Sequence, residues 1–244
     1  SRRRHTRCSR WSRGLGDVYK RQGMHRVSHG GHTGFHVTCS TPEVHAVEKA
    51  GFGLQAPVTL EAVIEEECCG NGALACMASG YDADAVLIPE PFGPTILTSQ
   101  LGVLWFKVTV EGRPVHVLEA PAGTNSIEKS FLIIQALRKL EDELNHIQVP
   151  KAYQNIPHPI NLNIGILNGG NWPSTVPAAS EMHCRLSYFP GTAYKEICHK
   201  IKATIQAAQT DDPWLSENPP IVEFYGFRSD GHTLSRDLPG CGTL

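Results

Sequence analysis

The chain has 244 residues, of which 41% are hydrophobic and 19% are charged, and its formal net charge is −2. This composition is typical of a globular protein with one large domain or two small ones, and it excludes a disordered chain. The overall charge gives no indication of a nucleic-acid partner, and no apolar run reaches the roughly 18 residues of a membrane-spanning helix, so we expect neither nucleic acid nor membrane as a partner.

Residues 1–22 differ from the rest of the chain. They contain eight Lys or Arg residues and one acid, Asp17, so they carry a charge of +7 and leave −9 for the remainder. A basic arm of this kind could bind nucleic acid. However, the segment has almost no apolar periodicity, and its GLGDVYKRQ stretch resembles translated adapter sequence. We therefore expect residues 1–22 to be a non-native or disordered extension outside the fold.

Cysteine usage indicates a reducing compartment. The eight cysteines form no CxxC pair and no regular framework, and the adjacent Cys68 and Cys69 are poorly placed to bridge each other. Residues 1–22 also lack the apolar segment of a signal peptide. We therefore expect free thiols and a cytoplasmic location.

The sequence of residues 56–91 predicts a parallel strand–helix–strand unit. Its two strands are apolar and each ends at acidic residues or prolines, and its helix opens at two glycines. Leu74, Met77 and Ala78 recur at helical spacing, and Met77 is expected in the core. In parallel sheets, chemistry gathers at the carboxyl ends of the strands. The expected strand, helix and strand cover residues 56–67, 70–81 and 83–91.

The part from Gly102 onward predicts an antiparallel α+β unit. Its order of strand, helix, strand, strand, helix, strand is ferredoxin-like. These elements are expected at 103–112, 125–145, 160–167, 181–189, 193–208 and 220–227. In the first strand the expected core-facing residues are Val103, Trp105, Val108 and Val110. In the long helix they are Ile127, Phe131, Ile134, Leu137, Leu140 and Leu144.

The most unusual stretch is VIEEECCGNGALAC, in which Glu65, Glu66 and Glu67 are adjacent. Three neighbouring carboxylates repel one another, so they require either water or a cation. A solvated acidic turn is the simpler interpretation. The glycines that follow, and Glu90 at the end of the next strand, favour a metal site, in which one carboxylate binds the metal and its neighbour acts as general base toward a metal-bound water.

Several motifs in a fixed order support this interpretation. They are EEECCGNGA, IPEP, GRPVH, GTNSIEK and GGNWPSTVP. With these motifs the chain, from about Gly30 onward, resembles the di-zinc deacylase and metallopeptidase family of acetylornithine deacetylase, succinyl-diaminopimelate desuccinylase, aminoacylase and carboxypeptidase G. The resemblance implies a hydrolase that uses zinc, or cobalt or manganese, to cleave the amide bond of a small N-acyl amino acid. It also implies a homodimer that forms through a lid domain, edge strand to edge strand and helix to helix.

The resemblance implies roles for individual residues. Glu66 matches the general base, Glu67 the adjacent metal ligand and Glu90 a ligand of one zinc. His116 in GRPVH matches a lid histidine that reaches the partner's active site and stabilises the oxyanion. Arg185 matches an arginine that binds the substrate carboxylate. Considered alone, His116 would be a surface histidine and Arg185 a surface ion pair, and Glu65 is a neighbour of the site.

Three further positions come from the lid. Gly169 and Gly170 match its glycine turn. Ser174 stands where an asparagine is usual in the family, so this contact to the substrate is expected to be weaker or different.

Other family positions are not matched. The sequence contains no His-x-Asp pair, Val27 stands where a bridging aspartate is expected, and His232 comes too early for the C-terminal histidine ligand. The histidines of HRVSHGGHTGFH could line one face of a helix and bind a metal, although the glycine pair argues against a regular helix. We therefore expect an incomplete, inactive fragment. The alternative is a non-catalytic dimerisation module with a relic metal site.

The expected fold is therefore an α/β catalytic domain with a partial, mostly parallel sheet and an inserted α+β ferredoxin-like lid. The boundaries are 23–100 for the partial catalytic domain, 101–212 for the dimerisation or lid domain, and 213–244 for a truncated return to the catalytic domain.

Overall fold

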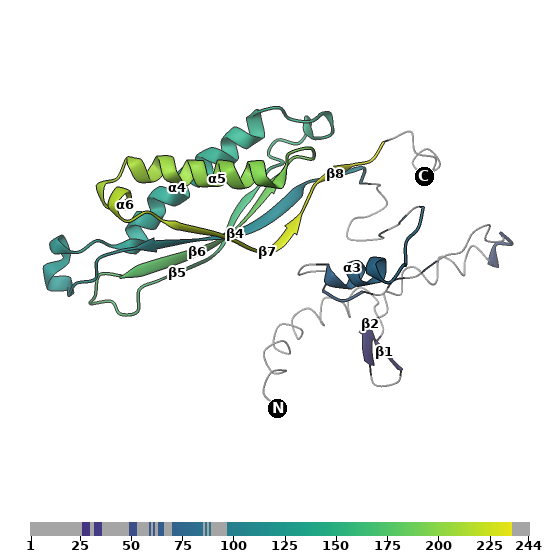
Figure 1. Cartoon of the computed structure of the whole chain (residues 1–244), viewed down its shortest axis with the longest axis horizontal. Coiled ribbons are helices and arrows are strands. Elements are labelled where there is room, and N and C mark those ends of the chain that lie inside the picture. The colour runs from purple at the N-terminus through teal and green to yellow at the C-terminus, as the bar shows by residue number, and fades with distance from the viewer. Residues whose placement is uncertain are drawn as a thin grey trace. The chain divides into compact units, whose positions relative to one another are not determined.

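The computed structural model describes residues 26–29, 32–35, 49–52, 59, 61, 63–65, 70–84, 86, 88 and 97–235 (Figure 1). The chain divides into two compact units, residues 1–95 and residues 96–244. Within the described residues, no helix has both the length and the apolar character needed to cross a membrane.

The described elements of the first unit are a hairpin and one helix. Strand β1 (Arg26–His29) pairs antiparallel with β2 (His32–Phe35), and the register places His29 opposite His32. These histidines therefore lie in strands, and the helical alignment considered for a metal site is not formed at the described positions. Helix α3 (Asn71–Ala78) lies within the predicted helix.

The predicted parallel strands of the first unit are not found at the described positions. None of the described residues within 56–67 or 83–91 belongs to a strand. Ile64 is exposed there, and Met77 of α3, expected in the core, is 67% exposed. A parallel strand needs a neighbour on each side and a covered face, and these apolar side chains have no such cover.

The second unit is a four-stranded antiparallel sheet with two long helices on one face (Figure 1). The sheet order is β5-β6-β4-β7, and every pair is antiparallel. This order and connectivity confirm the predicted ferredoxin-like arrangement. The elements are β4 (Gly102–Glu111), α4 (Ser126–His146), β5 (Leu162–Gly169), β6 (Ala179–Tyr188), α5 (Tyr194–Thr210) and β7 (Ile221–Ser229).

The core lies between the sheet and the helices. On β4 the buried face consists of Leu104, Phe106, Val108 and Val110, and Phe106 is fully buried. The prediction was wrong for Trp105, which lies on the opposite face and contacts the rings of Tyr225 and Phe227 at centroid distances of 6.4 and 6.0 Å. Successive side chains of a strand alternate between faces, so Trp105 cannot share a face with Val108.

The buried stripe of α4 is offset from the predicted one. Leu137 and Leu140 are buried as predicted, but Ile133 takes the place assigned to Phe131, which is half exposed. Polar residues complete the stripe: the buried residues of α4 are Ser126, Ser130, Ile133, Leu137, Leu140, Glu141 and Asn145.

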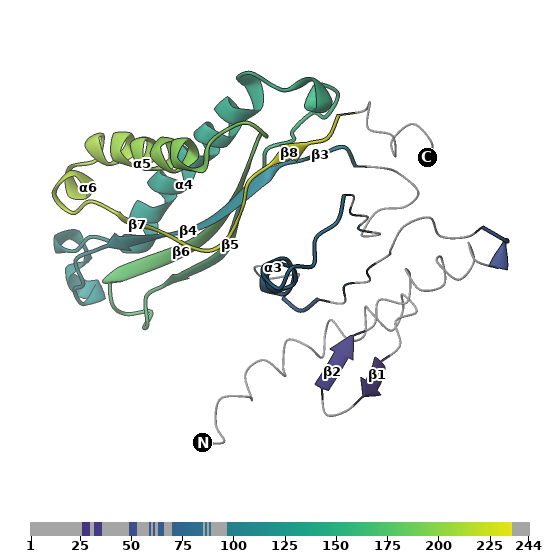
Figure 2. The ribbon, with the colours of Figure 1, turned by 45° about the vertical axis from the view of Figure 1, so that its right-hand side comes forward.

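Short elements close both ends of the second unit. Strand β3 (Ser99–Gln100) pairs with β8 (His232–Thr233), so the chain enters and leaves the unit through adjacent strands (Figure 2). The sheet continues past the predicted boundary at residue 212, because β7 pairs with β4. The remaining elements are the 3-10 helices η1 (Val117–Ala122) and η2 (Lys151–Tyr153) and helix α6 (Pro213–Glu217).

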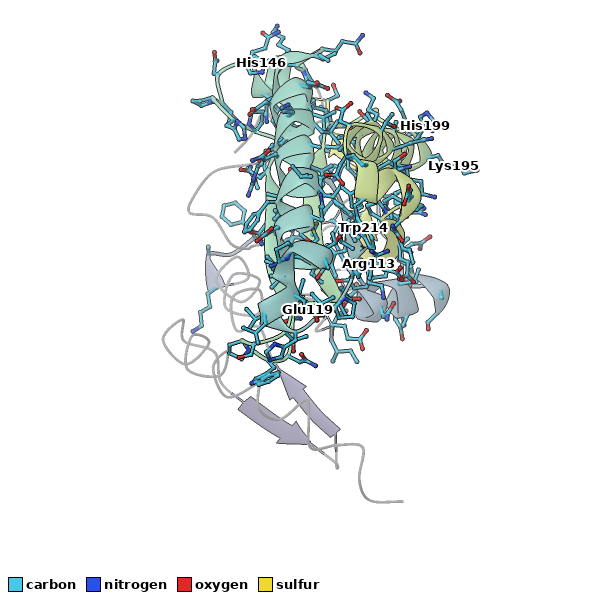
Figure 3. The ribbon with its side chains drawn as sticks, turned by 90° about the vertical axis from the view of Figure 1, so that its left-hand side faces the viewer. Arg113, Glu119, His146, Lys195, His199 and Trp214 are labelled. Carbon is cyan, nitrogen blue, oxygen red and sulfur yellow. The ribbon has the colours of Figure 1, made fainter. Side chains whose placement is uncertain are left out.

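Three long-range contacts hold α6 in place. The indole N–H of Trp214 donates a hydrogen bond to the backbone oxygen of Glu111 at 2.9 Å, and the guanidinium of Arg113 lies 5.4 Å from the centre of the Trp214 ring (Figure 3). The Asp212 carboxylate, which caps α6 at Leu215, also pairs with Lys129 of α4 at 2.5 Å. These contacts join α6 to both layers of the unit.

Asn125 stabilises the start of α4. Its side-chain oxygen accepts hydrogen bonds from the amides of Ile127 at 3.0 Å and Glu128 at 3.4 Å. Asn125→Ala removes this cap and is expected to lower the free energy of unfolding by about 1 kcal/mol. Asn125→Asp keeps the acceptor and is the matched control. Urea unfolding followed by circular dichroism measures both; equal midpoints for Asn125→Ala and the parent chain would contradict a role for the cap.

Candidate functional site

The predicted acidic site lies largely outside the described residues. Glu66, Glu67 and Glu90 all belong to the part that the structure does not describe, so their roles remain predictions. Glu65 is described, and its carboxylate accepts a hydrogen bond from the side chain of Asn71 at 2.7 Å. This contact connects the acidic stretch to the first turn of α3.

Two glycines shape the turn that follows the acids. Gly70 has a φ of 69°, in the left-handed region that favours glycine. At Gly72 an added Cβ would lie 2.5 Å from the backbone oxygen of Ile64. Only glycine therefore allows α3 to approach the preceding segment this closely, which gives a backbone reason for the GNG sequence beside the acids.

His116 lies in the loop after β4, where the loop between β5 and β6 packs against it. His116 and Thr175 form an isolated antiparallel bridge. The amide of Val117 donates to the backbone oxygen of Ser174 at 3.0 Å, and the His116 ring meets Trp172 edge-on with 6.2 Å between centroids. Residues 58 positions apart in the chain, His116 and Ser174, are thus brought to one place.

One ring nitrogen of His116 is engaged within its own loop. Nδ1 accepts a hydrogen bond from the amide of Leu118 at 3.3 Å, which places the proton of the neutral ring on Nε2. A donor at Nε2 is the group that oxyanion stabilisation requires. The loop lies at the end of the unit where α4 begins: Figure 3 labels Glu119 of η1 at this end and His146 at the other end of α4.

The glycine turn has local structural causes. At Gly169 an added Cβ would lie 2.7 Å from Cγ1 of Ile127, and Gly170 has a φ of 69°. Both glycines are therefore required by the packing and the backbone of the β5–β6 turn. Of the three predicted lid contacts, the structure brings Ser174 directly beside the His116 loop through the Val117 hydrogen bond.

Arg185 lies elsewhere on the unit. It is exposed in the middle of β6, opposite Trp105 of β4 and Asn163 of β5. This position is on the sheet face that the helices leave uncovered. Within one protomer, His116 and Arg185 therefore occupy different places, a loop beyond a strand end and the centre of a strand.

A polar cluster that the sequence motifs did not indicate lies on the same uncovered face. Nδ1 of His183 lies 2.5 Å from the Tyr225 hydroxyl, and its Nε2 lies 2.9 Å from a Glu181 oxygen. Lys107 pairs with Glu223 at 2.9 Å and with Glu181 at 3.6 Å. The two-residue alternation of β4 and β6 would have placed Lys107, Glu181 and His183 on one face.

Hydrogen bonding and burial shift the pKa values of two groups in this cluster. The hydrogen bond from His183 holds the pKa of Glu181 below its usual range, an effect that partial burial opposes and Lys107 supports. Burial raises the pKa of Tyr225. Among the residues that the structure describes, no group of three or more His, Cys, Asp or Glu side chains is arranged to hold a metal.

Residues 98–213 match the family model described as "Peptidase dimerisation domain". An acetylornithine deacetylase of Buchnera aphidicola is 26% identical over 155 residues, which cover 63% of this chain and 40% of the relative. A protein of Aspergillus clavatus described as "Probable carboxypeptidase" is 34% identical over 202 residues, which cover 76% of this chain and 41% of the relative.

The chain spans 40% to 52% of the length of the curated relatives that it matches. Among solved structures, a tripeptidase from Staphylococcus aureus has a TM-score of 0.39 at 14% identity, covering 59% of this chain and 33% of that chain. Residues 98–213 therefore match a peptidase dimerisation domain, and the chain is similar to acetylornithine deacetylases and carboxypeptidases, the proteins that its motifs indicated.

Proposed function

We propose that the chain serves in a metal-dependent amidohydrolase that cleaves the amide bond of an N-acyl amino acid, such as N-acetylornithine or N-succinyl-diaminopimelate. The observation that carries this proposal is the His116 loop. It lies within the residues that match peptidase dimerisation domains, and the hydrogen bond from the Leu118 amide to Nδ1 leaves the ring proton of His116 on Nε2. The names of the acetylornithine deacetylase relatives support the substrate class.

In this proposal each predicted residue has one task. Glu67 and Glu90 would hold the metal, which would be zinc or alternatively cobalt or manganese, and Glu66 would be placed as general base toward water. His116 would donate from Nε2 to the oxyanion of a substrate held by the partner subunit. Arg185 holds the substrate carboxylate with its guanidinium fork.

The donor set of this sequence does not fit a complete di-zinc centre. Glu67 and Glu90 are the two carboxylates assigned, and the sequence has no His-x-Asp pair and has Val27 in place of the bridging aspartate. Zinc in proteins takes four ligands in structural sites and three protein ligands in catalytic ones. We therefore derive no catalytic step by this chain alone through a metal.

We also propose that the second unit forms a homodimer. Strand β5 lies at an edge of the sheet, so its outer backbone groups can accept a strand from a second copy. Helix α4 packs beside β5 and carries the half-exposed Phe131, which supplies an apolar surface for a helix-to-helix contact.

The arrangement of the domains is part of the same proposal. The pairing of β3 with β8 brings the entry and the exit of the second unit together, as insertion into another domain requires. We assign residues 23–100 and those after β8 to the catalytic domain. We further propose a cytoplasmic location: the three described cysteines Cys76, Cys184 and Cys198 are unbridged, and burial raises the pKa of Cys184 to about 12.

The metal assignment can be tested by zinc titration of the full chain in a calorimeter. If Glu67 is a ligand, Glu67→Gln should weaken zinc binding by about tenfold or more, since even second-layer partners of metal sites contribute that much. Glu61→Gln, at an exposed acid a few residues earlier, is the matched control and should leave binding unchanged. Equal affinities for both variants would contradict the assignment.

The same preparation tests the enzymatic activity. Because the sequence has fewer metal ligands than a complete di-zinc centre, we expect the chain to release ornithine from N-acetylornithine at no more than the background rate. Turnover that Glu66→Gln abolishes would overturn this expectation and establish a working site. Absence of both zinc binding and turnover, in a chain that still dimerises, would favour the alternative of a dimerisation module with a relic site.

A further inference from the structure

The free edge of the sheet is occupied by side chains over part of its length. Asn145 of α4 binds both backbone groups of Ile160: its side-chain oxygen accepts from the Ile160 amide at 2.9 Å, and its side-chain NH₂ donates to the Ile160 oxygen at 2.9 Å. Asn145 is buried, so this contact lies away from solvent. An amide side chain thus takes the place of a neighbouring strand at Ile160.

The same pattern repeats two residues later. The amide of Leu162 donates to Glu141 at 2.7 Å, and the backbone oxygen of Leu162 accepts from Arg138 at 2.6 Å. Arg138 and Glu141 also pair with each other at 2.7 Å, and Glu141 is buried. Both backbone groups of the first residue of β5 are therefore bonded to side chains of α4.

The intervening residue points the other way. The amide of Asn161 donates to the Ser187 hydroxyl at 2.8 Å, and its backbone oxygen accepts from the Ser187 amide at 3.1 Å. Backbone groups of successive residues in an antiparallel strand alternate between its two neighbours. The groups of Ile160 and Leu162 are thus the outward ones, and these are the groups that an added strand would need.

The rest of β5 has a different character. Its register with β6 shifts between Ile164 and Ile166, and the strand then runs regularly to Gly169. Ile166 is 48% exposed and Leu167 is 41% exposed. An edge with unpaired backbone groups and exposed apolar side chains is a template for another strand.

We propose that Arg138, Glu141 and Asn145 seal the beginning of the β5 edge, so that a second copy of this chain pairs only along Ile164–Gly169. The backbone groups of Ser187 point toward β5, so by alternation those of His183 and Glu181 do too, and their partners Ile166 and Asn168 point toward β6. In the regular stretch the outward groups are therefore those of Leu167 and Gly169. Opposed residues of an antiparallel pair share their orientation, so the two-fold pairing within this stretch places Leu167 opposite Leu167 of the second copy. The inference rests on the proposed homodimer and adds its register. The seal resists opening because exposing the edge would leave the buried Glu141 carboxylate without the Leu162 amide.

The register can be tested by disulfide cross-linking of the full chain. The variant Leu167→Cys places two cysteines opposite each other across the two-fold axis of the proposed register, where opposed Cα atoms are about 4.5–5.5 Å apart. The variant Asn163→Cys is the matched control. Its cysteines oppose each other only if the second copy pairs with the sealed part, with Leu162 opposite Ile164.

On mild oxidation we expect most of the first variant, and little of the second, to run as a covalent dimer on a non-reducing gel, with the unsubstituted chain as background. Cross-linking of the Asn163→Cys variant would overturn the seal. Cross-linking of neither variant in a chain that sediments as a dimer would overturn pairing along β5. A monomeric mass at all concentrations would instead refute the homodimer itself, and the register with it.

Discussion

Replacing Glu141 with alanine is expected to lower the free energy of unfolding of the second unit by about 2–3 kcal/mol at neutral pH. The variant leaves the Leu162 amide without its acceptor in a buried position and removes the partner that Arg138 and His158 share. The penalty stays below that of a fully buried ion pair, because the side chains of Arg138 and His158 are 48% and 46% exposed and can be hydrated again.

Glu141→Gln is the matched control for this effect. Glutamine keeps an oxygen that can accept from the Leu162 amide, so we expect a loss of about 1 kcal/mol, which corresponds to the missing charge. Urea unfolding of the full chain, followed by circular dichroism, gives the midpoint and slope for each variant. Equal losses for alanine and glutamine would show that the amide contact is not what Glu141 contributes.

The charge of Glu141 also predicts a pH dependence. Burial raises its pKa, but the Leu162 amide, Arg138 and His158 outweigh burial, so the pKa lies below the usual value of 4.5. The stability from this carboxylate is therefore complete above pH 4.5 and is lost as the pH falls through the folded-state pKa. The stability difference between the parent chain and Glu141→Gln should shrink as the pH is lowered below this value; a constant difference would contradict this assignment.

The order of elements from Gly102 onward could be predicted because each element carries its own periodicity. The sequence does not decide which face is buried where that periodicity is weak. Residues 103–106 are four consecutive apolar residues, so alternation alone cannot decide whether Trp105 or Phe106 faces the helices. Likewise, α4 has apolar residues at 131–134, and the packing on the sheet selects Ile133 over Phe131.

The parts of the site that could not be predicted depend on distant contacts. Helical spacing puts Glu141 and Asn145 on the same side of α4 as Leu137, where the structure buries them. A hydrophobic pattern assigns no buried role to a carboxylate or an amide, because it contains no information about the Ile160–Leu162 segment that surrounds them. The proximity of His116 to Ser174 likewise comes from two loops far apart in the chain. Family motifs indicated both positions, but only the fold supplies the hydrogen bond between Val117 and Ser174.

The exposed residue Leu167 provides the test of the proposed dimer edge with the largest effect. Leu167→Lys is expected to raise the dimer dissociation constant by about a hundredfold. A two-fold interface contains each substitution twice, and losing an apolar side chain and introducing a lysine costs roughly 1–1.5 kcal/mol per copy, or about 2–3 kcal/mol in total. Lysine on an edge strand is also a common device against edge-to-edge pairing. Sedimentation velocity across a concentration series measures the constant.

Ile221→Lys is the matched control, because Ile221 is similarly exposed on β7 at the opposite edge of the same sheet. Its substitution should leave the dissociation constant within about threefold of the parent value, which corresponds to less than about 0.7 kcal/mol. If Ile221→Lys dissociates the dimer and Leu167→Lys leaves it intact, the interface lies at β7 and not at β5. In that case the sealed start of β5 would protect an edge that no second copy approaches, and the His116 loop would reach a partner by a different geometry.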